Sequence, residues 1–345
     1  MNPSRRLVIA ACAALSATAS QSLASAVIVQ DYPSVGKVLR FDPALDRLIA
    51  PGARIEQLAT GYTWSEGPVW ISEGGFLLFS DVPENRIYRW SEGEGASVFL
   101  DPSGYAGPDA SRFREPGSNG LIAGPAGSIL MADHGNRAIA RVDLVTHEKT
   151  LLATQYEGRR FNSPNDLVQA VDGAIYFTDP PYGLKDMDQS PDKELAHNGV
   201  YRLDPDGSVT LLVEDLTFPN GVALSPDEQT LYVAQSDPAR AVLLAYDLRA
   251  RGEVSKGRVL HDFTGDVRPD NPGLPDGMAV DAEGNIFVTG PGGVSILTPT
   301  GVLLGRIDTA GAAANCVFGP EGDLYITAGA RLLKVPTLTR AQGPR

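Results

Sequence analysis

The chain has 345 residues, of which 43% are hydrophobic and 21% are charged, and it contains 37 glycines and 26 prolines. This composition excludes collagen-like and disordered chains and favours a globular protein with many tight turns. The net charge of −13 excludes nucleic acid as a partner and argues against binding to anionic membrane surfaces.

The first 26 residues predict an export signal. Arg5 and Arg6 precede an apolar run over 7–15, and Ala24-Ser25-Ala26 offers a small-x-small cleavage site. The run is too short to cross a hydrocarbon core about 30 Å thick. We therefore predict a signal peptide over 1–26 that directs export by either the general or the twin-arginine route and is then cleaved. The mature protein is expected to be periplasmic or secreted and not to insert into a membrane.

The remainder, 27–345, contains a sixfold internal repeat. Each unit has a short polar motif, an apolar strand, a turn with glycine or an acidic residue, and a second apolar strand. The motifs lie at 66–70, 119–122, 165–168, 220–223, 276–279 and 314–317. Six hairpin-rich units without a sustained 3.6-residue period predict an all-β fold, a single six-bladed β-propeller.

The two ends of the chain and two long loops complete this prediction. The chain ends on an apolar strand at 332–335, so a strand near 55–58 is expected to complete the sixth blade and close the ring. Segments 101–117 and 183–198 interrupt the repeat, which resumes directly after each of them. We expect both to form walls or lids of a pocket.

The first residue of each motif occupies an equivalent position around the predicted channel. These residues are Glu66, Asn119, Asn165, Asn220, Asp276 and Ala314. If they converge, two carboxylates and several amide oxygens form a set that suits Ca²⁺, Mg²⁺ or Mn²⁺ better than a structural zinc. The alternative is that Asn-Gly and Asp-Gly are ordinary turn dipeptides, although a turn needs no glutamate.

The motifs, taken in order, resemble those of the gluconolactonase, senescence-marker-protein and luciferin-regenerating-enzyme superfamily from about residue 38 to about 335. Two further segments, 134–137 and 177–183, look most like its bacterial gluconolactonase branch. The motifs are Phe41-Asp42-Pro43-Ala44-Leu45, Glu66-Gly67-Pro68-Val69-Trp70, Phe161-Asn162-Ser163-Pro164-Asn165-Asp166, Phe218-Pro219-Asn220-Gly221 and Pro275-Asp276-Gly277-Met278.

The resemblance implies a six-bladed propeller with one divalent ion near the top of its channel, often Ca²⁺, with Zn²⁺, Mg²⁺ or Mn²⁺ as alternatives. It implies that Glu66, Asn165, Asn220 and Asp276 are the metal ligands. Asn119 would contact the substrate or a metal-bound water. Because Ala314 has no ligating group, it would leave the open position that a catalytic metal needs.

The reaction that this resemblance implies is hydrolysis of a sugar lactone, D-glucono-1,5-lactone to gluconate, and the implied partner is that small molecule. The predicted catalytic carboxylates are Glu66 and Asp276, with Asp276 as the first candidate for the base. Asp179 and Asp133 are the other candidates for that role.

Four further residues complete the predicted substrate site alongside Asn119. His134 either donates to the substrate or fixes a loop, and Arg160 matches an arginine that holds substrate in some family members. Asp179 and Tyr182 belong to the second segment shared with the bacterial branch.

Two other functions stay open, and the oligomeric state cannot be inferred. The same metal site could act on another lactone or on a phosphotriester, or the propeller could bind a sugar or a protein without catalysis. The sequence contains no Gly-x-Ser-x-Gly motif, which argues against a serine esterase of the α/β-hydrolase type.

Overall fold

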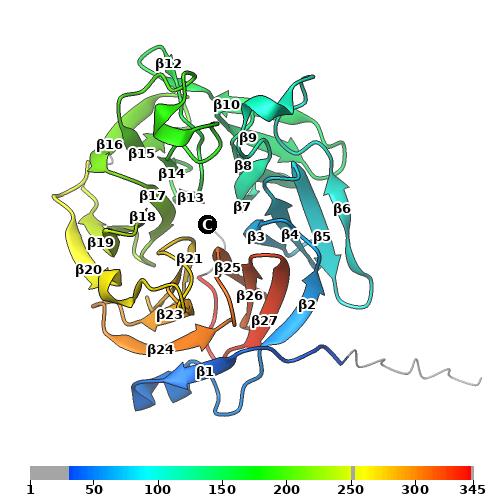
Figure 1. Cartoon of the computed structure of the whole chain (residues 1–345), viewed down its shortest axis with the longest axis vertical. Coiled ribbons are helices and arrows are strands. Elements are labelled where there is room, and N and C mark those ends of the chain that lie inside the picture. Colours follow the sequence, from blue (N-terminus) through cyan, green and yellow to red (C-terminus); the bar gives the residue numbers. More distant parts are fainter. Residues whose placement is uncertain (1–30, 250–252, 343–345) are drawn as a thin grey trace, which may run out of the picture. The chain divides into compact units, whose positions relative to one another are not determined.

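The computed structural model describes residues 31–249 and 253–342, so the predicted signal peptide lies outside the described residues. Within these ranges, no helix is both long enough and apolar enough to span a membrane. The unit that begins at Tyr32 is a ring of six antiparallel sheets, which confirms the predicted six-bladed β-propeller (Figure 1).

The first four blades follow one another along the chain, each as a four-stranded antiparallel meander. Blade one contains β3 (Ser65–Ile71), β4 (Phe76–Asp81), β5 (Arg86–Ser91) and β6 (Gly95–Leu100). Blade two contains β7 (Ser118–Gly124), β8 (Ser128–Asp133), β9 (Ala138–Asp143) and β10 (Lys149–Ala153). Blade three contains β13 (Leu167–Gln169), β14 (Ile175–Asp179), β15 (Asn198–Leu203) and β16 (Val209–Leu216). Blade four contains β17 (Pro219–Leu224), β18 (Thr230–Asp237), β19 (Arg240–Asp247) and β20 (Arg258–Asp262).

The last two blades recruit strands from the beginning of the described chain. Blade five contains β21 (Met278–Val280), β22 (Ile286–Gly290), β23 (Gly293–Leu297) and β24 (Leu303–Asp308), with β1 (Lys37–Arg40) added at its outer edge. Blade six contains β25 (Asn315–Phe318), β26 (Asp323–Ala328) and β27 (Arg331–Pro336), and β2 (Glu56–Thr60) pairs antiparallel with β27. This pairing confirms the predicted ring closure by an N-terminal strand.

Short 3₁₀-helices and a small sheet lie outside the six blades. The 3₁₀-helices are η1 (Pro43–Arg47), η2 (Ala110–Arg112), η3 (Met187–Gln189) and η5 (Thr264–Asp266). A separate two-stranded sheet joins β11 (Gln155–Tyr156) to β12 (Arg159–Arg160).

The hydrophobic core is divided among the six interfaces between neighbouring blades. Between blades one and two, for example, Leu78 and Ile87 pack in one cluster with Ile129 and Met131, and all four are buried. The second strand of each blade, counted from the centre, is buried on both faces, which is why these strands are mostly apolar. The innermost strands β3, β7, β13, β17, β21 and β25 surround the centre of the ring (Figure 1).

The glycines of the repeat let neighbouring blades approach each other backbone to backbone. The Gly120 N–H donates to the Asn165 carbonyl oxygen of the next blade at 2.8 Å. A Cβ on Gly221 would lie 2.1 Å from the Asp276 carbonyl oxygen, also of the next blade. Because Gly120 and Gly221 lie within β7 and β17, the alternative that these Asn-Gly pairs are turns is wrong.

We expect truncation of Leu332 to weaken the closing blade. Leu332 is fully buried on β27, opposite Ala59 of β2, and replacement by alanine should cost about 2–5 kcal/mol of the free energy of unfolding. Leu338→Ala is the matched control, since Leu338 is 60% exposed and should cost about 0.5 kcal/mol or less. Urea denaturation measures both values, and equal losses would contradict the expectation.

Candidate active site

A cavity of about 910 Å³ opens at the end of the ring where the innermost strands begin. The structure brings five of the six predicted ring residues together in its lining: Glu66, Asn119, Asn165, Asn220 and Asp276. The first four are buried, and Asp276 is partly exposed. Each lies on an innermost strand or within two residues of its start, so the repeat itself delivers these side chains to one place.

Three asparagines form a directional chain of amide hydrogen bonds across neighbouring blades. Asn119 Nδ2 donates to Asn165 Oδ1 at 2.8 Å, and Asn165 Nδ2 donates to Asn220 Oδ1 at 2.6 Å. Asn220 Nδ2 in turn donates to Ser236 Oγ at 2.9 Å. This series of hydrogen bonds fixes the orientation of each side-chain amide. Each side-chain carbonyl oxygen that accepts one bond keeps a second lone pair for a ligand.

Glu66 and Asp276 are a like-charged pair in a poorly solvated place. Burial raises the pKa of Glu66 to about 8, although the N–H of Gly67 hydrogen-bonds its carboxylate at 2.8 Å. Burial and the nearby Glu66 charge together raise the pKa of Asp276 well above its usual value. Deprotonating both carboxylates therefore costs free energy that a bound cation would recover.

The charges around this pair leave it without a cationic partner. The two arginines of the lining bind other carboxylates: Arg114 lies 3.0 Å from Glu115, and Arg268 lies 3.5 Å from Asp270. Within residues 31–249 and 253–342 no ion pair joins Glu66 or Asp276 to a lysine or arginine. Two carboxylates and two amide oxygens without a cation fit a hard divalent ion.

The four candidate ligands, Glu66, Asn165, Asn220 and Asp276, differ from a metal site made only of carboxylates and imidazoles. In the part of the chain that the structure describes, no three His, Cys, Asp or Glu side chains come together as a metal cluster. Half of the candidate ligands are asparagine amides, which such a cluster would not include. The fit therefore rests on the four oxygens together and not on the carboxylates by themselves.

Residues 64–330 match the family described as the SMP-30/Gluconolactonase/LRE-like region. The chain belongs to this family. A gluconolactonase of Zymomonas mobilis is 44% identical over 96% of this chain and 95% of its own length. A pentonolactonase of Haloferax volcanii is 27% identical over 76% of this chain and 80% of its own.

Solved structures agree with this assignment. A gluconolactonase structure from Xanthomonas campestris superposes with a TM-score of 0.75 at 36% identity, covering 90% of this chain and 99% of the other. The ring of blades is thus a fold that this chain shares with a solved gluconolactonase.

Besides Asn119, two residues predicted to bind substrate lie at or beside the cavity. Tyr182 lines it and stacks on Phe218, with ring centroids 6.0 Å apart. His134 is fully buried behind the wall, with its Nε2 3.5 Å from Asn119 Nδ2 and its Nδ1 3.4 Å from a Glu115 carboxylate oxygen. The geometry favours the alternative in which His134 supports the wall instead of touching a ligand.

The structure places Asp179 and Asp133 away from the cavity lining. Both Asp179 oxygens accept backbone N–H groups, from Asn162 at 2.7 Å and Ser163 at 2.8 Å, and burial raises the pKa of Asp179 to about 7. Asp133 is buried beneath Lys149, whose Nζ lies 2.8 Å away. Both carboxylates hold backbone or a lysine in place, which leaves neither one facing a substrate.

Arg160 also lies outside the lining. It is exposed on β12, and its guanidinium donates to the Asn136 carbonyl oxygen at 2.8 Å. The intervening segment is held by the bonds of Asn162 and Ser163 to Asp179, so Arg160 stays on the outer hairpin.

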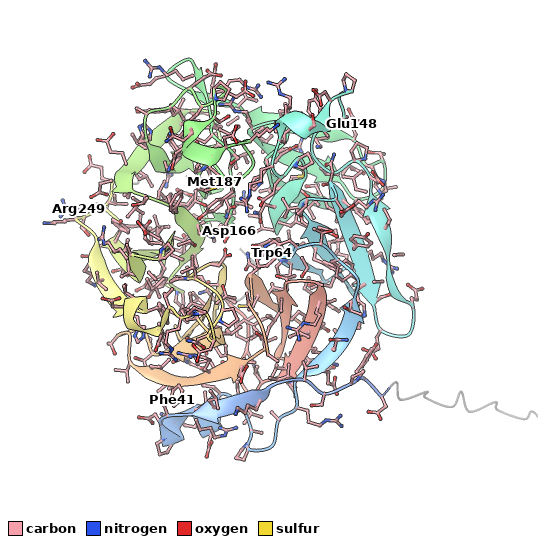
Figure 2. All side chains as sticks on the ribbon, viewed as in Figure 1. Phe41, Trp64, Glu148, Asp166, Met187 and Arg249 are labelled. Carbon is pink, nitrogen blue, oxygen red and sulfur yellow. The ribbon has the colours of Figure 1, made fainter. Side chains whose placement is uncertain are left out.

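The cavity walls come from three loops, two of which were predicted. Segment 101–117 contributes Arg114 and Glu115, and segment 183–198 contributes Met187, which confirms their role as pocket walls. The third wall, 267–274, was missed. It has the same signal as segment 101–117, a proline- and glycine-rich interruption between blades, here blades four and five. In Figure 2, Trp64, Met187 and Asp166 lie around the centre of the ring, whereas Phe41, Glu148 and Arg249 lie at its outer edge.

Proposed function

We propose that this protein is a divalent-metal-dependent lactonase that hydrolyses D-glucono-1,5-lactone to gluconate. The observation that carries the proposal is the convergence of Glu66, Asn165, Asn220 and Asp276 in the cavity of a chain 44% identical to a named gluconolactonase. The cavity volume of about 910 Å³ falls within the range of about 300–1,000 Å³ that is usual for small-molecule sites.

The four oxygen-bearing side chains would hold the ion, for which Ca²⁺ is the first candidate. A divalent cation at that position supplies the positive charge that polarises an ester carbonyl and offsets the oxyanion formed as water adds. The chain of Asn119, Asn165 and Asn220 amides keeps the ligand oxygens oriented before any substrate arrives. When both carboxylates are ionised, a bound dication would neutralise their charge.

The remaining lining residues are suited to a sugar ring. Tyr182 and Phe218 present a stacked aromatic surface, and Asn119 offers an amide beside the ligand set. The loop walls exclude part of the surrounding water, which strengthens electrostatic interactions inside the cavity. We further propose that the mature protein begins after residue 26 and acts in the periplasm or outside the cell.

Chelation of the ion tests the proposal. We expect purified protein to hydrolyse gluconolactone well above the spontaneous rate, to lose that activity in EDTA, and to regain it when Ca²⁺ is added in excess. Mg²⁺, Mn²⁺ and Zn²⁺ added separately identify the preferred ion. Hydrolysis no faster than the uncatalysed rate with every ion would refute the lactonase assignment.

A second substrate class is favoured by the Haloferax relative, which is named a pentonolactonase. Five-carbon aldonolactones carry the same carbonyl and ring oxygen in a smaller body. Parallel assays with pentono- and hexonolactones on one preparation decide between the two classes, because the metal requirement is shared and only kcat/KM differs.

A further inference from the structure

Glu115 is a third carboxylate in the cavity lining, besides Glu66 and Asp276. It lies on the wall formed by segment 101–117, and its side chain is 13% exposed. All three carboxylates line the same cavity, and the negative charge of Glu115 is among the lesser causes that raise the pKa values of Glu66 and Asp276. It does not join them in a metal cluster, as no such group of three exists among the described residues.

The backbone around Glu115 is held by the neighbouring wall. The N–H groups of Arg114 and Glu115 both point to the Gly183 carbonyl oxygen, at 3.1 Å and 3.4 Å. Gly183 must itself be a glycine, because a Cβ there would lie 2.7 Å from the Cβ of His134. The two loops and the buried histidine therefore form one packed unit that presents the Glu115 side chain.

His134 orients the Glu115 carboxylate through a defined tautomer. Its Nε2 faces the Asn119 amide nitrogen, which can only donate, so Nε2 is the acceptor and Nδ1 carries the proton. That Nδ1 is buried and makes no hydrogen bond in the described structure, and Glu115 Oε2 is the carboxylate oxygen beside it, 3.4 Å away. In a serine-protease triad the imidazole contacts the reacting group and a buried carboxylate orients it. Here the roles are exchanged: the Glu115 carboxylate faces the cavity, and the His134 imidazole lies behind it.

Among the three carboxylates of the cavity lining, Glu115 is the one without another assignment. Glu66 and Asp276 belong to the proposed ligand set, and Asp179 and Asp133 are buried against backbone N–H groups and Lys149. Arg114 Nη1 lies 3.0 Å from Glu115 Oε1 and also donates to the Tyr182 carbonyl oxygen at 3.2 Å. It uses one of about four acceptor sites that an ionised carboxylate offers. A carboxylate oxygen of Glu115 is thus available to a molecule in the cavity.

We propose that Glu115 is the catalytic residue that transfers protons in lactone hydrolysis and that His134 is its positioning residue, an inference that rests on the proposed lactonase function. As the oxygen of a water molecule bonds to the lactone carbonyl carbon, Glu115 takes one proton from that water. When the bond from that carbon to the ring oxygen breaks, the protonated Glu115 gives its proton to the departing oxygen. The hydroxy acid leaves, and Glu115 is again a carboxylate.

The test compares three variants with the wild-type enzyme, all loaded with Ca²⁺ and assayed with gluconolactone as substrate. In Glu115→Gln and Glu115→Ala, kcat should fall about 100-fold or more while KM changes little. Added formate should restore much of the kcat of Glu115→Ala by supplying the missing carboxylate, which a merely structural residue would not allow. Glu84→Gln is the matched control, an exposed glutamate near the cavity mouth but outside its lining.

The outcomes separate this inference from the proposed function. A wild-type enzyme without metal-dependent hydrolysis overturns both. An active wild type with Glu115→Gln at full kcat, with an effect on KM alone, or with no formate rescue of Glu115→Ala overturns the Glu115 assignment only. Both variants are checked for unchanged Ca²⁺ affinity and unfolding midpoint, and Glu115→Gln, which keeps the side-chain shape, serves if the alanine variant does not fold.

A second pair of variants tests the role of His134. His134→Asn keeps a donor near the Nδ1 position and should retain more of the wild-type kcat than His134→Leu, which has similar volume and no donor. Equal kcat values for the two variants would contradict positioning through the Nδ1–H.

Discussion

Asp276→Asn is expected to lower kcat/KM for gluconolactone by about a thousandfold and to abolish tight Ca²⁺ binding. Asp276 and Glu66 are the two carboxylates of the candidate ligand set, and the cavity offers them no cationic side chain in compensation. Removing one leaves a single negative charge and three amides, a set with too little charge to hold a divalent ion at a partly desolvated position. The fold should survive, because asparagine keeps the size of the side chain.

Calorimetric titration with Ca²⁺ and a steady-state assay measure the two effects on the same protein. Asp270→Asn is the matched control, since Asp270 is an 83% exposed carboxylate on the same rim. It removes an equal charge from the third wall without touching the ligand set. Wild-type Ca²⁺ affinity in Asp276→Asn would exclude Asp276 as a ligand and would require another group to hold the ion.

Gly221→Ala is expected to damage both the fold and the site, although it alters no ligand. The new Cβ would lie 2.1 Å from the Asp276 carbonyl oxygen and 2.8 Å from both the Asp276 carbonyl carbon and Gly277 Cα. These are all backbone atoms, so the innermost strand of blade five must move away from blade four. Overpacking of this kind costs about 1–3 kcal/mol of the free energy of unfolding.

The same displacement moves Asp276, and a shift of about 1 Å at a reacting centre can lower the rate about 100-fold. Gly265→Ala is the control, since a Cβ at Gly265 meets no atom within 4 Å. Chemical denaturation, Ca²⁺ titration and kcat/KM should all change in Gly221→Ala and stay near wild type in Gly265→Ala. A Gly221→Ala protein with full Ca²⁺ affinity would contradict the role of blade spacing in placing Asp276.

The repeat made the ring and its inner residues predictable from the sequence. Rotational equivalence converts a spacing along the chain into a position in space, so Glu66, Asn119, Asn165, Asn220 and Asp276 could be grouped before any coordinates were known. The sequence could not show why a glycine follows several of these residues. A dipeptide signals a turn, and only the packing of adjacent blades shows that Gly120 and Gly221 lie in strands.

The predictions became weaker outside the repeat. Arg160 and Asp179 were grouped with the site by resemblance, yet their hydrogen bonds hold loops and hairpins. Glu115 was missed because its position depends on how one irregular loop packs on another, through Gly183 and His134. Such packing between segments about 70 residues apart leaves no periodic signal in the sequence.

The pairing of β2 with β27 imposes an order on how this protein can be made. Ser65, at the start of blade one, donates to the Gly329 carbonyl oxygen, 264 residues later in the chain. A ribosome delivers the early segment first, and β2 then has no partner until nearly the whole polypeptide has emerged. The last blade therefore assembles after synthesis is almost complete, since contacts of such large sequence separation form slowly. Until that moment the ring stays open between its first and last blades.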